Sequence, residues 1–144
     1  MKVNEAPVVV EAVFNLPKDM VWKAISNHTE MLNWYFDNIP AFKPEVGFST
    51  QFNVKAPSQD FLHIWTITEV IPFQKLVYNW TFKDVEGSAD VYFELFDLGD
   101  KTKLVVTNKV IEDFNDDIPE FKRESCLGGW HYFINERLKN YLNS

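Results

Sequence analysis

The sequence contains one cysteine, no long hydrophobic run and no apolar leader, and each absence excludes a class of protein. Cys126 has no second cysteine to pair with, so an internal disulfide is excluded, and a solitary thiol is typical of a reducing compartment. Residues 1–5 lack the apolar core of a signal peptide. No apolar run approaches the roughly 20 residues that a membrane-spanning helix needs. We therefore expect a cytoplasmic protein.

Positive charge is also scarce. Lys and Arg number 14 against 21 Asp and Glu, which gives a formal net charge of −7. Nucleic acids and anionic membranes are bound chiefly through clusters of Lys and Arg, and the sequence contains no such cluster. We therefore predict no nucleic-acid partner and no membrane partner.

Motifs for catalysis and for metal binding are missing. There is no glycine-rich phosphate loop, no nucleophile elbow and no Cys/His spacing of a metal site. The acidic run at 112–117 lacks the spacing of a calcium loop and is typical of a solvated segment. The histidines His28, His63 and His131 are far apart in the sequence. We expect no cofactor and no metal.

Aromatic residues, by contrast, are abundant. Five Trp, five Tyr and 13 Phe make up 16% of the 144 residues. This is more ring area than the core of one small domain needs, which favours rings that line a cavity or a contact surface. The length fits a single domain, residues 1–144.

Periodicity predicts one strand, two short helices, five strands and one long helix. Alternating apolar residues predict strands at 8–14, 48–54, 61–71, 76–82, 91–96 and 104–110. Pro17 opens a first helix and Thr29 caps a second. From 119 to 142 the pattern is helical, with an apolar stripe of Leu127, Trp130, His131, Ile134, Leu138 and Tyr141.

Strands joined by tight turns indicate an antiparallel meander, and a striped helix packs best in the concave face of a bent sheet. The predicted fold class is α+β: a curved antiparallel sheet of about six strands around a long C-terminal helix, with two short helices after the first strand. Gly128 and Gly129 interrupt that helix, which indicates a close strand, a bend or a gap in the packed face.

Local motifs in the same order resemble a known family. Segment 17–25 follows a proline with V-W-x-A, and 31–35 is similar to L-x-x-W. Segment 69–80 matches E-x-x-P-x-x-x-L-x-Y-x-W, 101–107 resembles G-x-T-x-L-x-x-T, and 129–138 resembles G-W-x-x-x-L-x-x-L. On these motifs the chain resembles the activator-of-heat-shock-protein-90-ATPase homologue-like family, in the START-like (SRPBCC, birch-pollen-allergen-like helix-grip) superfamily.

The resemblance implies the helix-grip fold and a cavity between sheet and helix. One departure is Trp65, where the family commonly has glycine, because a bulky ring there would fill or redirect the cavity. We expect a small hydrophobic or aromatic ligand. The residues that we expect to contact it are Trp34, Phe52, Trp65, Tyr78, Trp80, Phe93, Leu127, Trp130, His131 and Ile134.

Two alternatives stay open beside ligand binding. The resemblance also implies a partner-binding module, with a chaperone or another protein as partner, in a monomer or a homodimer. A cyclase- or hydrolase-type enzyme would need two polar groups in the cavity, and His63 with His131 is the one pair that the sequence offers. Cys126 is interpreted as a buried structural thiol. We favour binding over catalysis.

Overall fold

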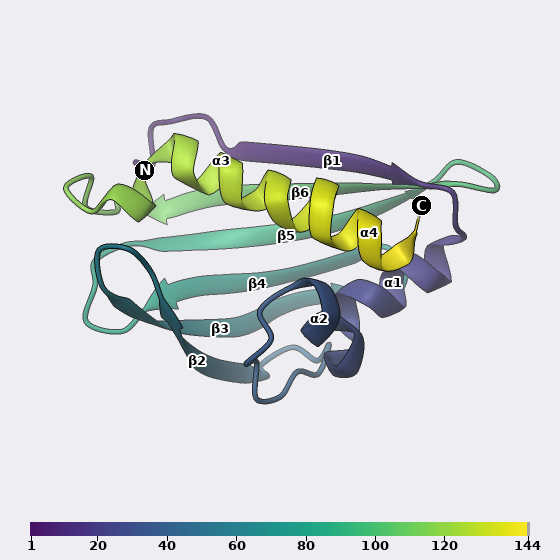
Figure 1. Cartoon of the computed structure of the whole chain (residues 1–144), viewed down its shortest axis with the longest axis horizontal. Coiled ribbons are helices and arrows are strands. Elements are labelled where there is room, and N and C mark those ends of the chain that lie inside the picture. Colours follow the sequence, from purple (N-terminus) through teal and green to yellow (C-terminus); the bar gives the residue numbers. More distant parts are fainter. Residues whose placement is uncertain (144) are drawn as a thin grey trace.

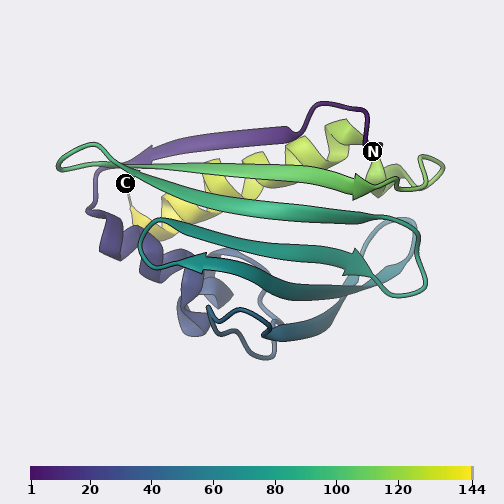
Figure 2. The same cartoon turned by 180° about the vertical axis from the view of Figure 1, so that it is seen from behind.

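A six-stranded antiparallel sheet curves around one long C-terminal helix in the computed structural model, which describes residues 1–143 (Figure 1). The strand order is β1-β6-β5-β4-β3-β2, so the first and last strands in sequence pair with each other. Seen from behind, the sheet forms one layer in front of the helix (Figure 2). The predicted α+β helix-grip fold is confirmed. The strands are β1 Val8–Phe14, β2 Ser49–Lys55, β3 Asp60–Ile71, β4 Lys75–Phe82, β5 Ser88–Asp97 and β6 Thr102–Glu112.

Side chains alternate between the two faces of the sheet, as the period-two pattern predicts. In β1 every second residue is buried, and the same alternation runs along most of β3, β5 and β6. The turn before β5 needs glycine for two reasons. Gly87 has φ +114, and a Cβ there would lie 2.2 Å from the ring of Phe114, so no larger residue fits.

Two short helices, α1 Lys18–Ser26 and α2 His28–Trp34, close the end of the sheet where β1 finishes (Figure 1). The predicted cap at Thr29 is wrong by two residues. Asn27 ends α1 and caps α2, because its side-chain oxygen accepts from the backbone N–H of Glu30 at 3.2 Å. His28 lies in the first turn of α2, with its Nε2 2.6 Å from the carbonyl oxygen of Ile39.

The C-terminal helix begins after a 3₁₀ turn, Pro119–Phe121, and changes its winding partway along. It comprises α3 Arg123–His131, a π-helical segment Tyr132–Leu138 and α4 Lys139–Leu142. Figure 1 shows these pieces as one continuous helix across the concave face.

The buried residues of this helix are four positions apart in the sequence. Trp130, Ile134 and Leu138 are each 5% exposed or less. In an α-helix a step of four overshoots a full turn by about 40°, and the wider π turns reduce that drift. His131 follows Trp130 by about 100° and is exposed, as is Tyr141. Their predicted places on the stripe are therefore wrong.

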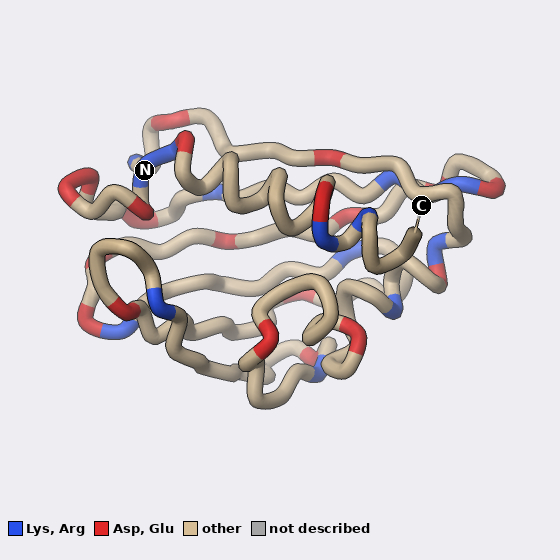
Figure 3. The backbone as a smooth tube through the Cα atoms, in the orientation of Figure 1, with Lys and Arg blue, Asp and Glu red and all other residues tan. Residues whose placement is uncertain are grey.

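Charged residues are spread over the surface. In Figure 3 the Lys and Arg positions lie singly or in short groups on loops, strands and helices, interspersed with Asp and Glu. Within residues 1–143 no helix is long and apolar enough to cross a bilayer.

Candidate ligand-binding cavity

Closely packed aromatic rings fill the part of the concave face beside α2. Trp65 is 1% exposed, with ring centroids 5.2 Å from Tyr35, 4.9 Å from Phe52 and 4.8 Å from Tyr78. Tyr35 stacks in turn on Trp34 at 4.5 Å. The indole at position 65 thus occupies space that a glycine would leave empty, as the departure from the family pattern predicts.

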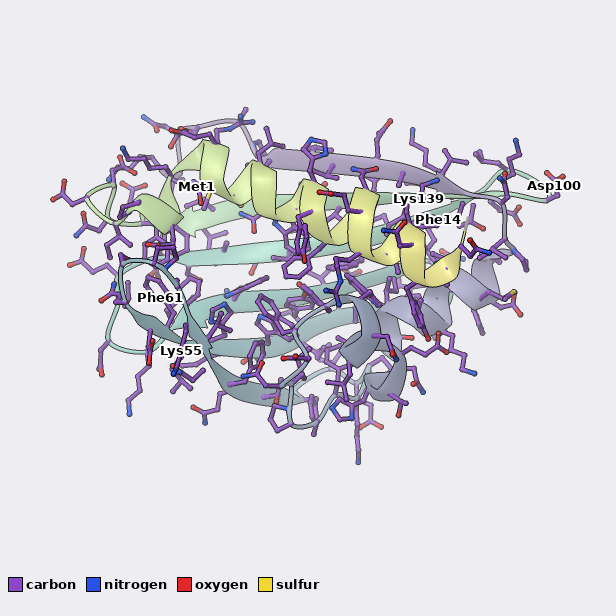
Figure 4. All side chains as sticks on the ribbon, in the orientation of Figure 1. Met1, Phe14, Lys55, Phe61, Asp100 and Lys139 are labelled. Carbon is purple, nitrogen blue, oxygen red and sulfur yellow. The ribbon has the colours of Figure 1, made fainter. Side chains whose placement is uncertain are left out.

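An open cavity remains toward the other end of the sheet, beneath the first turns of α3. Its volume is about 200 Å³. Figure 4 places two of its lining residues, Met1 and Phe61, at the end of the molecule opposite Asp100. The sheet contributes Val54, Phe61, His63, Trp80, Phe82, Ala89 and Asn108, and the turn after β2 contributes Ala56. The C-terminal segment contributes Phe114, Glu120, Phe121, Cys126, Gly129, Trp130 and Phe133. An apolar cavity of about 150 Å³ holds benzene, so this one suits one or two small rings.

The structure separates the predicted ligand residues into groups. Trp80 and Trp130 line the cavity. Leu127 is partly exposed on α3, and His131 is exposed, where its Nδ1 lies 3.1 Å from Nδ2 of Asn135. The others are buried outside the cavity lining: Trp34, Phe52, Trp65, Tyr78, Phe93 and Ile134.

Two of the residues that line the cavity carry a buried N–H donor with no acceptor in the part of the chain that the structure describes. Trp80 Nε1 and Asn108 Nδ2 are both shielded from solvent and without a hydrogen-bond partner among the described residues. Asn108 is 5% exposed and faces inward on β6, after Leu104 and Val106. Trp65 Nε1, in the packed rings outside the cavity, is a third such donor, so unpaired donors are not confined to the cavity residues.

His63 is a buried, uncharged wall of the cavity. Its Nδ1 lies 3.2 Å from the carbonyl oxygen of Phe61. A carbonyl can only accept, so Nδ1 carries the proton and Nε2 is left as an acceptor. Burial lowers the pKa of His63 to about 4, against a smaller upward effect of that hydrogen bond. At neutral pH the ring is therefore neutral.

Cys126 is a shielded thiol. Burial raises its pKa to about 11, opposed by weaker effects of the Trp130 side chain, the N-terminal ammonium of Met1 and Arg123. The thiol thus stays protonated at neutral pH and is a poor nucleophile. This agrees with the prediction of a structural cysteine, although the side chain also lines the cavity.

Gly129 leaves room for the cavity on the helix side. A Cβ built at Gly129 or at Gly128 would meet nothing within 4 Å. No strand therefore approaches the glycine pair, and the helix continues through it. Of the predicted reasons for these glycines, a gap in the packed face fits Gly129, which lines the cavity, whereas Gly128 does not line it.

A hydrogen-bonded clasp joins the β2–β3 turn to the segment before α3. The backbone N–H and the hydroxyl of Ser58 donate to the two carboxylate oxygens of Glu120, at 3.1 and 2.5 Å. These hydrogen bonds, led by that of the Ser58 side chain, hold the pKa of Glu120 below its usual value. Because Glu120 lines the cavity, the clasp lies beside its rim.

Sequence reasoning missed several cavity residues. The signal for Asn108 was present: it is a polar residue in the inward phase of a strand that is otherwise apolar on that face. Phe61, Phe82 and Ala89 point inward on their strands, like the predicted core residues. The alternation of inward and outward residues cannot distinguish a cavity wall from the core. Throughout residues 1–143 no group of three or more His, Cys, Asp or Glu side chains is placed to hold a metal ion.

Comparison with known proteins agrees with this architecture. The model of the family described as Activator of Hsp90 ATPase homolog 1-like protein matches residues 15–143. None of the curated proteins searched matches the chain.

Solved structures share the fold at low sequence identity. DynU16, described as a protein in the dynemicin biosynthetic locus, is 23% identical with a TM-score of 0.77; the match covers 97% of this chain but only 48% of DynU16. Protein CV1439 from Chromobacterium violaceum is 17% identical with a TM-score of 0.79, over 96% of this chain and 97% of that one. The Aha1 dimer from Colwellia psychrerythraea is 15% identical with a TM-score of 0.73, over 96% of both chains.

Proposed function

Because the chain belongs to the Activator of Hsp90 ATPase homolog 1-like family, whose fold leaves a space between sheet and helix, we propose that it binds one small hydrophobic or aromatic molecule there. The observation that carries the proposal is the cavity of about 200 Å³, which is lined mainly by apolar and aromatic side chains. Binding sites for small molecules in proteins are concave and predominantly apolar in the same way.

The proposed role is binding rather than catalysis. A general base works best with a pKa near the working pH, whereas the pKa of His63 is lowered to about 4. His131 is exposed on the helix and does not line the cavity with His63. The raised pKa of Cys126, about 11, leaves the thiol unactivated. These properties favour a binding site over an active site.

Filling the cavity from the helix side tests the proposal. We would titrate ¹⁵N-labelled protein with a panel of one- and two-ring aromatic compounds and follow the indole N–H signals of Trp80 and Trp130. Saturable shifts are expected in the parent. Gly129→Leu should abolish them, because its side chain would project into the cavity. Gly128→Leu is the matched control on the same helix and should bind like the parent. Equal binding by both variants, or no saturable shift in the parent, would contradict the proposal.

A second candidate function is the binding of a partner protein. The exposed apolar residues in and near the turn between β3 and β4 favour it. Phe73 is 44% exposed, has φ 66 and packs on Trp22 with ring centroids 6.1 Å apart. Exposed Met20 and Ile71 belong to α1 and to the end of β3. Exposed apolar residues of this kind mark protein contacts when they are contiguous.

The family name supplies the partner to test. Purified heat-shock protein 90 would be assayed for ATPase rate with and without this chain. A stimulation that Phe73→Ser abolishes, and that Val46→Ser on a different exposed loop retains, would support this candidate. An unchanged ATPase rate would remove it.

We place this function in the cytoplasm, in a monomer or a homodimer. The single thiol, Cys126, supports a reducing compartment. Cell fractionation tests the location, and sedimentation equilibrium tests the oligomeric state. Recovery from an extracellular or membrane fraction would contradict the first part, and a larger assembly would contradict the second.

A further inference from the structure

The side chain of His63 presents the tip of its ring to the cavity. On β3 the residue pairs with Phe52 of β2 and Phe82 of β4, so neighbouring strands cover its backbone on both sides. It lies in the buried phase of β3, between Phe61 and Trp65. Nε2 and Cε1 are the ring atoms farthest from the backbone, so they point from the sheet into the concave side, where His63 lines the cavity.

The Nε2 atom of His63 is unpaired and open to this space. In the part of the chain that the structure describes, the ring is hydrogen-bonded through Nδ1, to the carbonyl oxygen of Phe61, and Nε2 has no partner. The buried side-chain nitrogens that are both unpaired and sealed from a molecule the size of water are those of Trp65, Trp80 and Asn108. Nε2 of His63 is not among them, so a small molecule in the cavity can reach it.

This open atom is an acceptor. Because Nδ1 of His63 donates to a carbonyl, Nε2 holds a lone pair. Burial lowers the pKa of His63 to about 4, so the ring keeps this form at neutral pH. A carbonyl or carboxylate of a ligand would present a second acceptor to Nε2, whereas a hydroxyl or N–H group would complete a hydrogen bond. The wall therefore favours a ligand that carries a donor.

The charged groups of the described lining residues are already paired within the protein. The N-terminal ammonium of Met1 lies 2.9 Å from Oδ1 of Asp116 and 2.5 Å from the carbonyl oxygen of Phe121. The carboxylate of Glu120 accepts both hydrogen bonds of the Ser58 clasp. An anionic ligand would have to share the ammonium with a carboxylate, whereas a neutral donor meets a ring nitrogen that has no partner in the described part of the protein.

The rings around this nitrogen favour a flat ligand. The ring centroid of His63 lies 5.3 Å from that of Trp80 and 4.8 Å from that of Phe82, and both of these rings also line the cavity. Planar molecules pack well against aromatic walls, by offset stacking or by edge-to-face contact. We infer that the ligand is an uncharged aromatic compound with an O–H or N–H group, which donates a hydrogen bond to Nε2 of His63. This inference rests on the proposed binding function and names the chemistry of that same site.

Phenol and toluene test the inference, because they differ by a hydroxyl in place of a methyl group. Phenol is neutral at pH 7, as a tyrosine side chain is. Both would be titrated into ¹⁵N-labelled protein while the ring nitrogens of His63 and the indole N–H groups of Trp80 and Trp130 are observed. Both should shift the indole signals saturably. Phenol should also move the ¹⁵N signal of Nε2 upfield, as expected for an imidazole nitrogen that accepts a hydrogen bond, and toluene should leave it nearly in place.

The ratio of the two affinities measures the contribution of the acceptor. His63→Phe keeps a ring of similar size and removes the acceptor, so the hydroxyl of phenol would be buried without a partner. The affinity of phenol relative to toluene should then fall about tenfold or more. His131→Phe is the matched control, because His131 is exposed and does not line the cavity, and it should leave the ratio unchanged. Benzoate, which brings an acceptor instead of a donor, should bind the parent more weakly than phenol.

The outcomes separate this inference from the function on which it rests. An unchanged ratio in His63→Phe, or an Nε2 signal that stays in place while phenol binds, overturns the donor assignment and leaves the binding function standing. Tighter binding of benzoate than of phenol also overturns it, because the ammonium of Met1 would then receive the polar group. If no probe produces a saturable shift, both proposals fail. The Nε2 signal is read in the parent protein, so the test holds even if His63→Phe does not fold.

Discussion

Tyr35 and Tyr78 meet through their hydroxyl groups in the buried interior, with the two phenol oxygens 2.5 Å apart. Tyr35 ends α2 and Tyr78 lies in the middle of β4, so the pair joins a short helix to the centre of the sheet. Burial is the main reason why the pKa of each phenol is raised. The two residues therefore remain neutral and depend on each other for a partner.

Removing both hydroxyls of this pair should cost less than the sum of the two single removals. Tyr78→Phe leaves the hydroxyl of Tyr35 buried without a partner, and we expect a loss of roughly 1–3 kcal/mol in the free energy of unfolding. Tyr35→Phe should have a similar effect, whereas the double variant should lose clearly less than the sum. Urea denaturation of the four proteins measures this coupling. Strictly additive losses would contradict the pairing.

The two helix glycines should respond alike in stability. Neither Gly128 nor Gly129 has an atom within 4 Å of a built Cβ. Gly128→Ala and Gly129→Ala should therefore each raise the free energy of unfolding by roughly 1 kcal/mol, the propensity difference between the residues. Thermal and chemical denaturation measure the gain. A loss of stability in either variant would mean that the helix packs more closely there than the structure shows.

His63 should make the fold sensitive to acid. Its pKa is lowered from about 6.5 to about 4 in the folded state, so between these values the unfolded chain binds a proton that the folded chain does not. Stability should fall as pH falls from about 6.5 to 4, by about 3 kcal/mol from this residue, with no further loss from it below pH 4. His63→Phe should lack this component. We would compare unfolding free energies of parent and variant from pH 7 to 4; parallel curves would refute the prediction.

Leu138 is a position of the C-terminal helix where a charged side chain should destabilise the fold. It is fully buried, and Leu138→Asp should lower stability by roughly 4 kcal/mol or more, because an unpaired carboxylate would enter the core. Asn140→Asp, exposed in the same last turns, should change stability by less than about 0.5 kcal/mol. Circular-dichroism melts of both variants test the stripe. Similar melts would show that the helix is seated differently.

The order of elements could be predicted from the sequence because short-range rules decide it. Period-two patterns define the strands, and the turn residues at Gly87 and Gly99 separate them. The stripe of the last helix was predictable only in part. Its π-helical turns keep Trp130, Ile134 and Leu138 on one side, and a spacing of three or four cannot reveal that change in winding.

The position of the cavity could not be predicted, because it depends on how rings from distant segments share the concave face. Trp65 and Trp80 are paired neighbours on β3 and β4. One is buried among the rings beside α2, and the other lines the open space. Both lie in the same inward phase, so alternation alone treats them as equivalent. His63 and Asn108 were the residues whose polarity in that phase carried information about the site.

The clasp between Ser58 and Glu120 bears on the rates at which a ligand would enter and leave the cavity, more than on its affinity. It joins two segments beside the cavity that are distant in sequence, through hydrogen bonds that are exposed to water. Water competes for the same donors and acceptors when a hydrogen bond is exposed, so these bonds break and reform often. Loop motions of this size occur in nanoseconds to microseconds. If the cavity binds a small ligand, loop opening at this rate would not limit how fast the ligand enters and leaves.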